Sequence, residues 1–322
     1  MKKMLSFLAR TGIAAAALAY AVWGVDFSRL VDALASFRLE YVLVYVVMAL
    51  GSAVAPGLRL RFLVAGRVGA ATGLRACLMG LALNNVLPAR LGEMAKALYL
   101  RREASISLGR ALEAVFWERF FDLNALLALG AAVAALLGQG LILYPLLGVV
   151  GCGWCFLAFL SASPELAHGL LRFVPGGKVR LLAGEMFGLL EGNLRAAFLG
   201  GLSLWTAACW LGYLSVYGVG LCLMAGLPAD PVLVLTVFAV ATLGFALPGA
   251  PGGMGVFEAS MVLALGWFGV DKDRAFAVAL AMHLLQYLPL TAAGLWSLAA
   301  SGMSMADLRR RSSDAEAGAP AA

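Results

Sequence analysis

The chain has 322 residues, of which 62% are hydrophobic and only 13% are charged. Soluble domains carry about a quarter charged residues, so this composition excludes a soluble catalytic domain as the body of the chain. The formal net charge of +6 is weak evidence for a nucleic-acid partner, because the basic residues are sorted into short segments between apolar stretches. The sequence therefore predicts a single all-α polytopic membrane domain over residues 1–302.

Six stretches are apolar and long enough to cross a bilayer as helices, which takes about 20 residues. In chain order the predicted full spans are 5–25, 39–56, 111–137, 141–162, 197–226 and 275–299. The first stretch also resembles a secretory signal, because Lys2 and Lys3 precede an apolar run. The stretch 39–56 supplies a return span, so we expect the first span to remain uncleaved.

Two further apolar segments, 74–100 and 231–269, are broken in the middle by proline and glycine. Lipid cannot satisfy the backbone groups that such a break frees, so the break must be covered by protein or line a wet cavity. Leu87–Pro88 in the first segment corresponds to Leu247–Pro248 in the second. We predict two re-entrant helical hairpins that form an inverted repeat, as in many transporters. Two ordinary full spans over residues 231–269 are the alternative.

Basic residues gather on one predicted side of the membrane. That side receives the clusters within 2–10, 59–75, 96–110, 172–195 and 309–311. The opposite side receives only four basic residues, each near an acid: Arg29, Arg38, Lys272 and Arg274. By the positive-inside rule we expect both termini in the cytoplasm of a bacterial-type inner membrane, with Arg59 in a cytoplasmic connector.

The two halves, 1–162 and 197–302, are joined by the connector 163–196. Within it, residues 178–195 place apolar side chains at helical spacing and predict an interfacial amphipathic helix. The tail 303–322 lacks core-forming residues and is predicted to be disordered.

The third span carries a charged turn. From Asp122 onward it offers only about fifteen apolar residues, or about 23 Å, so Glu118, Arg119 and Asp122 must dip into the membrane. Charges at that depth need partners, and Arg119 can pair with Asp122 locally. An internal ion pair that fixes helix packing and a lipid-headgroup site explain this turn equally well.

The first break is followed by Arg90, Glu93 and Lys96 at three-residue spacing, which places them on one helix face. A guanidinium offers paired donors to a phosphate, so we favour a headgroup site over a solvated turn. No metal cluster or nucleophile–base pair is evident in the sequence, and we expect no cofactor.

The second break ends at Glu258, a lone carboxylate in an apolar run and therefore a candidate functional residue. His283 and Tyr287 share a helix face in the last span. A packing histidine is the commoner explanation, with a proton relay or a headgroup contact as the alternative. Cys152 and Cys155 have the spacing of a thiol redox motif, but they lie inside an apolar span without a second pair, so we expect coincidence.

Four motifs resemble the membrane domain of the lysylphosphatidylglycerol synthase/flippase family over nearly the whole chain: LNNVLPARLGEMAKALYL, WERFFDLNAL, LPGAPGGMGVFEASMVLALG and HLLQYLPLTAAG. The resemblance implies these marked positions: Pro88, Arg90, Gly92, Glu93, Glu118, Arg119, Asp122, Pro248, Gly252, Gly253, Gly255 and Glu258. The candidate substrate-binding set also includes Asn84, Asn85, Lys96, His283 and Tyr287. Lys96 and His283 stand where the family pattern has arginine.

The resemblance implies lipid translocation with a phosphate-containing headgroup: a phospholipid, an aminoacyl-phospholipid or a polyprenyl-phosphate-linked sugar. No soluble aminoacyl-transferase domain is attached, so we do not expect synthesis of lysyl-phosphatidylglycerol. The alternatives are an ion- or proton-coupled transporter of a small polar solute, a membrane enzyme acting on a lipid-linked substrate, and a non-catalytic component of hopanoid or lipid biosynthesis. We expect membrane lipids as partners, and a homo-oligomer is compatible with the sequence.

Overall fold

The computed structural model describes residues 2–87, 91–162, 195–246 and 250–303, together with the single residues 169 and 184. Several sequence predictions lie outside these residues: Pro88, Arg90, Pro248, nearly all of the interfacial helix 178–195, and the tail beyond residue 303.

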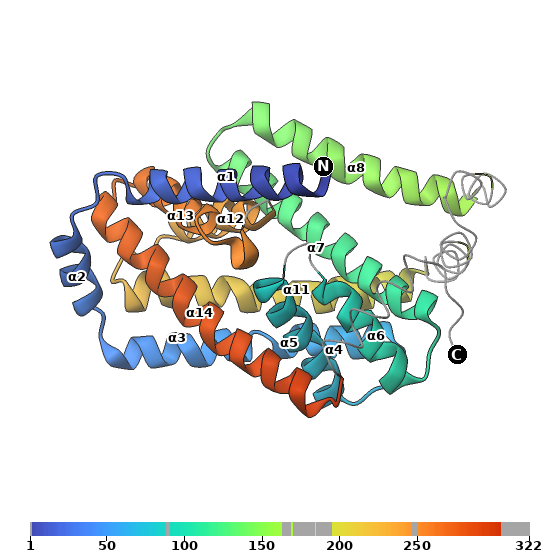
Figure 1. Cartoon of the computed structure of the whole chain (residues 1–322). Helices are drawn as coiled ribbons and strands as arrows, with labels where there is room; N and C mark the ends of the chain where they lie inside the picture. The colour runs from blue at the N-terminus through green and yellow to red at the C-terminus, as the bar shows by residue number, and fades with distance from the viewer. Residues whose placement is uncertain are drawn as a thin grey trace.

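Helices make up the described fold (Figure 1). In order they are α1 (Lys2–Val22), α2 (Phe27–Ala35), α3 (Leu39–Gly51), α4 (Val54–Leu63), α5 (Ala70–Val86), α6 (Gly92–Ala104), α7 (Leu108–Leu136), α8 (Gly140–Ala162), α11 (Ala196–Gly218) with its π-helical continuation η3 (Val219–Met224), α12 (Pro231–Ala246), the 3₁₀ turn η4 (Pro251–Gly253), α13 (Val256–Gly266) and α14 (Lys272–Ala300). We found no strand among the described residues.

Five helical stretches in the described part are long and apolar enough to cross a membrane: Leu39–Leu63, Leu108–Leu136, Gly140–Phe159, Ala196–Met224 and Lys272–Ala300. The pair Thr11–Val22 and Phe27–Ala35, bent by 82°, is a sixth candidate. The protein is therefore a polytopic all-α membrane protein, as predicted. The second span ends at Leu63 instead of residue 56, because α4 continues α3 after a short break.

The short helix α2 was not predicted. It begins at Asp26, whose side chain accepts a hydrogen bond from the Ser28 backbone N–H at 2.9 Å and so caps the helix. The backbone N–H of Asp26 donates to Asp273 at the start of α14. Lys272 donates to two carbonyl groups at the end of α1, so this basic residue caps a helix terminus.

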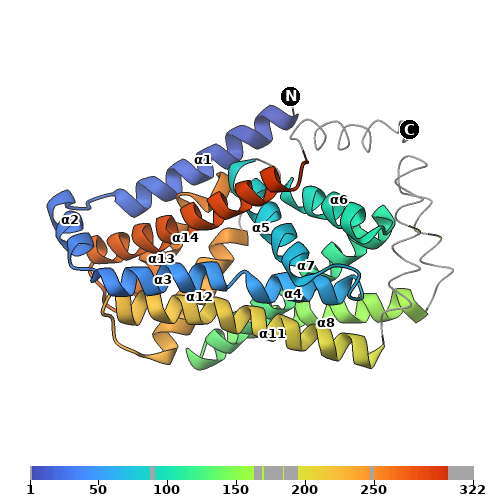
Figure 2. The same ribbon diagram turned by 90° about the horizontal axis from the view of Figure 1, so that it is seen from below.

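The two broken segments form two helix pairs, in which α5 packs against α6 and α12 packs against α13. Each of these four helices is shorter than the about 20 residues that a full span needs, which favours hairpins over full spans. α6 ends near Ser301, which accepts a hydrogen bond from Arg102, whereas the turn before α12 lies at Arg274, near the start of α14. The hairpins therefore enter from opposite ends of the molecule, and both views show them beside opposite halves of α14 (Figures 1 and 2).

The hydrophobic core is divided between the two ends of the molecule. One cluster gathers around Tyr45, Leu221 and Met282, and includes parts of α12, α13 and the first half of α14. The other gathers around Leu60 and Trp117, and includes α5, α6 and α7. Because each hairpin is packed into its own core, the polar tips of the two hairpins are left at the junction between the cores.

Candidate functional site

Arg59 of α4 lies at the centre of a buried ion-pair network, with only 1% of its side chain exposed. Its guanidinium binds both carboxylate oxygens of Asp122, at 2.6 and 2.9 Å, and Glu118 at 3.3 Å. Thr206 accepts a further hydrogen bond at 3.2 Å, and the indole of Trp210 donates to Asp122 at 3.3 Å. The bidentate geometry fixes α4 against α7 and links both helices to α11.

Lys96 of α6 extends this network toward the first hairpin tip. Its ammonium group lies 3.0 Å from Glu118 and 3.3 Å from Glu93. Glu93 in turn binds the guanidinium of Arg119 at 2.7 Å, and Arg119 also reaches Asp122 at 3.7 Å. Six charged groups in the described chain, three basic and three acidic, thus compensate one another inside the protein, as buried charges require.

Asn84 ties the end of α5 to the start of α6. Its amide donates to Glu93 at 3.1 Å, and its carbonyl oxygen accepts the backbone N–H of Gly92 at 2.9 Å. A side chain at Gly92 would overlap the carbonyl oxygen of Gly80 and the Asn84 amide. Gly92 is therefore required by the close approach of α5 to α6, and Gly80, where a side chain would contact Lys96, leaves room for that residue.

Exposure distinguishes the three basic groups of the network. The side chains of Arg59 and Lys96 are 1% and 3% exposed, whereas that of Arg119 is 50% exposed. Arg119 is therefore the basic member that can reach a ligand without leaving its place in the network.

A second polar cluster joins the tip of the second hairpin to α14. The Nδ1 atom of His283 lies 2.6 Å from Glu258 Oε1, and its Nε2 atom lies 3.0 Å from the carbonyl oxygen of Gly252. The other oxygen of Glu258 accepts the backbone N–H of Gly255 at 2.7 Å. Gly252, Gly253 and Gly255 all have positive φ angles, which explains why this break is built from glycine.

The first hairpin tip is held by the same helix, one turn later. The Tyr287 hydroxyl donates to the backbone carbonyl of Asn85 at 3.2 Å, and the Asn85 side-chain amide donates to Thr291 at 2.8 Å. His283 and Tyr287 therefore bring the tips of both hairpins onto one face of α14.

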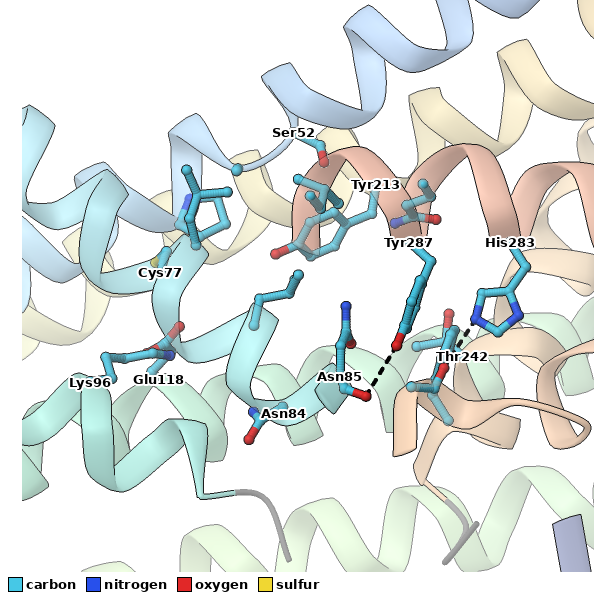
Figure 3. A pocket seen from close by; sticks show the side chains of 18 of the residues that line it. Ser52, Cys77, Asn84, Asn85, Lys96, Glu118, Tyr213, Thr242, His283 and Tyr287 are labelled. Carbon is cyan, nitrogen blue, oxygen red and sulfur yellow. Dashed lines mark hydrogen bonds and ion pairs between the residues drawn. The ribbon is translucent and has the colours of Figure 1, made fainter. Parts of the chain in front are cut away.

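A cavity of about 400 Å³ connects the two clusters. Its polar lining comes from Asn84, Asn85, Lys96, Glu118, Arg119, Tyr213, Thr242, His283, Gln286 and Tyr287. Figure 3 shows Lys96 and Glu118 on one side of the cavity and His283 on the other, with Tyr287 and Asn85 between them. The remaining wall is mostly apolar, and includes the break between α3 and α4 at Ser52 and Ala53.

The geometry differs from the sequence hypothesis in one respect. We expected Glu93, Arg90, Arg119 and Glu258 to converge on one polar site. Glu93 and Arg119 do pair, but Glu258 pairs with His283 in a separate cluster, and the cavity lies between the two clusters. Arg90 lies outside the described residues.

The placement of Arg59 in a cytoplasmic connector was wrong. The apolar stretch around Pro56 continues past Arg59 to Leu63, and this was the signal that the span extends further. Thr206 and Trp210 were also missed, since nothing near them in the sequence marks them as partners of a charge. Cys152 and Cys155 are exposed free thiols on α8, and we found no group of metal-binding side chains in the described parts of the chain.

Comparison with known proteins gives two matches. Residues 7–294 match the sequence profile of the lysylphosphatidylglycerol synthase transmembrane region. A UPF0104 membrane protein of Methanocaldococcus jannaschii is 28% identical over 221 residues, which cover 66% of this chain and 91% of that protein.

Proposed function

The chain belongs to the family of lysylphosphatidylglycerol synthase transmembrane regions, and from this membership we propose that it is a lipid translocator for a phosphate-containing headgroup. The substrate is a phospholipid, an aminoacyl-phospholipid or a polyprenyl-phosphate-linked sugar. The headgroup passes through the cavity between the hairpin tips while its hydrocarbon chains stay in lipid. We further propose the cytoplasmic membrane as its location, with both termini in the cytoplasm.

The observation that carries this proposal is the cavity of about 400 Å³ between two hairpins that enter from opposite ends. Transporters built from inverted repeats place their substrate sites where broken helices meet, near the membrane midplane. The cavity wall combines apolar side chains with the polar groups of the hairpin tips, the charged network and α14, so a headgroup can follow polar groups through the cavity.

Arg119 is the proposed phosphate ligand. Its side chain is half exposed and lines the cavity, and its guanidinium pairs with Glu93 and Asp122. A planar guanidinium can bind two phosphate oxygens at once, and exchange of one carboxylate contact for a phosphate contact keeps the charge compensated. Lys96 and Arg59 are enclosed by their carboxylate partners and act mainly to hold the network in place.

The test is headgroup accessibility in reconstituted vesicles that contain fluorescent phospholipids or polyprenyl-phosphate sugars. Arg119→Gln should slow translocation by about tenfold or more, because a charge-assisted hydrogen bond is worth about 1.5–3 kcal/mol. Arg61→Gln, which changes an exposed arginine on α4, is the matched control and should keep the parent rate. Mass spectrometry of the recovered lipid distinguishes movement from a reaction on the headgroup.

If folded Arg119→Gln protein moves every tested lipid as fast as the parent, Arg119 is not the ligand. If the parent itself moves none of them, the transporter of a small polar solute becomes the better interpretation of the same cavity.

A further inference from the structure

We propose that Glu258 and His283 form a proton-binding site that couples headgroup movement to a proton gradient, an inference that rests on the translocator function proposed above. The site consists of the carboxylate of α13, the imidazole of α14 and the glycine turn over residues 250–255. Both side chains are more than nine-tenths buried, at 6% and 7% exposure, yet His283 lines the cavity.

The contacts of the imidazole fix where its hydrogens lie. The Gly252 carbonyl oxygen, 3.0 Å from Nε2, can only accept a hydrogen bond, so Nε2 must carry a hydrogen. Nδ1 and Glu258 Oε1 are 2.6 Å apart, a distance that requires one hydrogen between them. That hydrogen belongs either to His283 or to Glu258, and in both cases the pair holds one bridging proton.

The bridge depends on its proton. If the bridging proton leaves, an imidazole nitrogen and a carboxylate oxygen face each other as two acceptors. A second proton goes to the carboxyl group, where it meets the Nδ1 hydrogen on Oε1 or weakens the contact of Oε2 with the Gly255 N–H. Loss of one proton therefore opens the His283–Glu258 contact, and gain of one proton weakens the contacts of Glu258.

The same pair holds both sides of the glycine break. His283 binds the Gly252 carbonyl, and Glu258 binds the Gly255 backbone N–H at 2.7 Å. When the bridge opens, the contact of His283 with the η4 turn is no longer linked to the contact of Glu258 with the start of α13. The tip of the second hairpin, which lines the cavity at Gly252, is then free to move.

Few titratable side chains lie near this pair among the described residues. The titratable neighbours are Tyr287, with its ring 5.8 Å from the imidazole, and Tyr45, whose hydroxyl donates to the carbonyl before His283. α12 contributes Phe245, and Ala14 and Leu18 of α1 lie next to Gly255. Asp273, which pairs with Arg29 of α2, lies at the start of α14, about three helical turns before His283.

The charged network around Arg59 is different in kind. Each of its described carboxylates contacts at least one arginine or lysine, which stay protonated across the physiological range. Imidazole is the side chain that exchanges its proton near neutral pH. The two clusters therefore have different functions: the network binds the headgroup, and the Glu258–His283 pair binds and releases a proton.

The first experiment measures opening of the tip without any lipid substrate. Ala250→Cys is placed in a background in which the accessible Cys152, Cys155 and Cys222 are serine, and its maleimide labelling rate is followed between pH 5 and pH 9. The rate is divided by that of Ser36→Cys, an exposed control position, so that ionisation of the thiol cancels. We expect this ratio to change by at least about threefold across the range.

In the Glu258→Gln variant the amide can still donate to His283, so the bridge persists without the acidic proton, and the ratio should be flat above neutral pH. A flat ratio in the parent, or the same pH profile in Glu258→Gln and the parent, would overturn the proton site. The Glu258→Gln protein must elute as a folded species. If it does not, His283→Asn, which keeps an amide donor on α14, takes its place.

The second experiment measures coupling in vesicles with an imposed pH gradient. The parent should move the fluorescent lipid at least about threefold faster in one gradient direction than in the other, and Glu258→Gln should move it equally in both. Equal rates for the parent overturn the coupling while the translocator function stands. A pH-dependent labelling ratio in a protein that moves no lipid supports the proton site and rejects the translocator function.

Discussion

Replacement of Arg59 by methionine is the most severe single perturbation that the structure predicts. The change keeps a long side chain but removes four polar contacts: two to Asp122, one to Glu118 and one to Thr206. Removal of one partner from a buried ion pair costs about 3–5 kcal/mol, because the remaining charge stays buried without compensation. Asp122 would keep only Trp210 and a distant Arg119, so we expect a loss of about 4 kcal/mol, or about a thousandfold in the unfolding equilibrium.

The measurement is the free energy of unfolding in mixed micelles, with sodium dodecyl sulfate as denaturant and circular dichroism as the signal. Arg61→Gln changes an exposed arginine two positions along the same helix and should stay within about 0.5 kcal/mol of the parent. If Arg59→Met cannot be purified, Asp122→Asn removes charge from the same pair with little change of shape and should cost about 1–3 kcal/mol.

A double-variant cycle of Arg59→Met with Asp122→Asn measures the interaction energy of this pair separately from other losses of core packing. The double variant should be less destabilised than the sum of the single variants by about 1–3 kcal/mol, because the uncompensated charge on residue 122 is removed. If Arg59→Met costs no more than Arg61→Gln, or if the two effects simply add, the network does not stabilise the protein in the way argued here.

Two further predictions follow from packing and topology. Gly92→Ala should lower the free energy of unfolding by about 1–3 kcal/mol or more in the same micelle assay, because the new methyl group would overlap the Gly80 carbonyl. The control is Gly148→Ala on α8, where a methyl group meets no atom within 4 Å and should not destabilise the protein. Cysteines introduced at Arg67 and Asp271 should be labelled by a membrane-impermeant reagent from the cytoplasmic and the outer side respectively, and labelling of both from one side would contradict the opposed hairpins.

The arrangement of spans could be predicted because membrane crossing depends on local composition. Five of the predicted spans overlap helical stretches that are long and apolar enough to cross, and the first overlaps the bent α1–α2 pair. The breaks were visible for the same reason, since proline and glycine stand close together in each of them, whereas single prolines such as Pro145 and Pro289 lie within helices. The pairing of Glu118 and Arg119 with buried partners was expected from the cost of charge at their depth.

The partners themselves could not be predicted from local composition. Arg59 and Asp122 are 63 positions apart in the sequence. Hydropathy assigns each of them a free-energy cost of entering the membrane and contains no information about their contact. Their contact depends on how α4 packs against α7, which local composition does not specify. The pairing of Glu258 with His283 likewise depends on how α13 crosses α14, which spacing along either helix does not specify.

The order of the charged groups along the chain has a consequence for biogenesis. Every described member of the network around Arg59 lies between residues 59 and 122, on α4, α6 and α7. A chain that is still being synthesised therefore possesses all six compensating charges once α7 has emerged, before α11 supplies Thr206 and Trp210. The six charges of the network can therefore enter the membrane already compensated within the first half, and α11 then contacts the network through the neutral groups of Thr206 and Trp210.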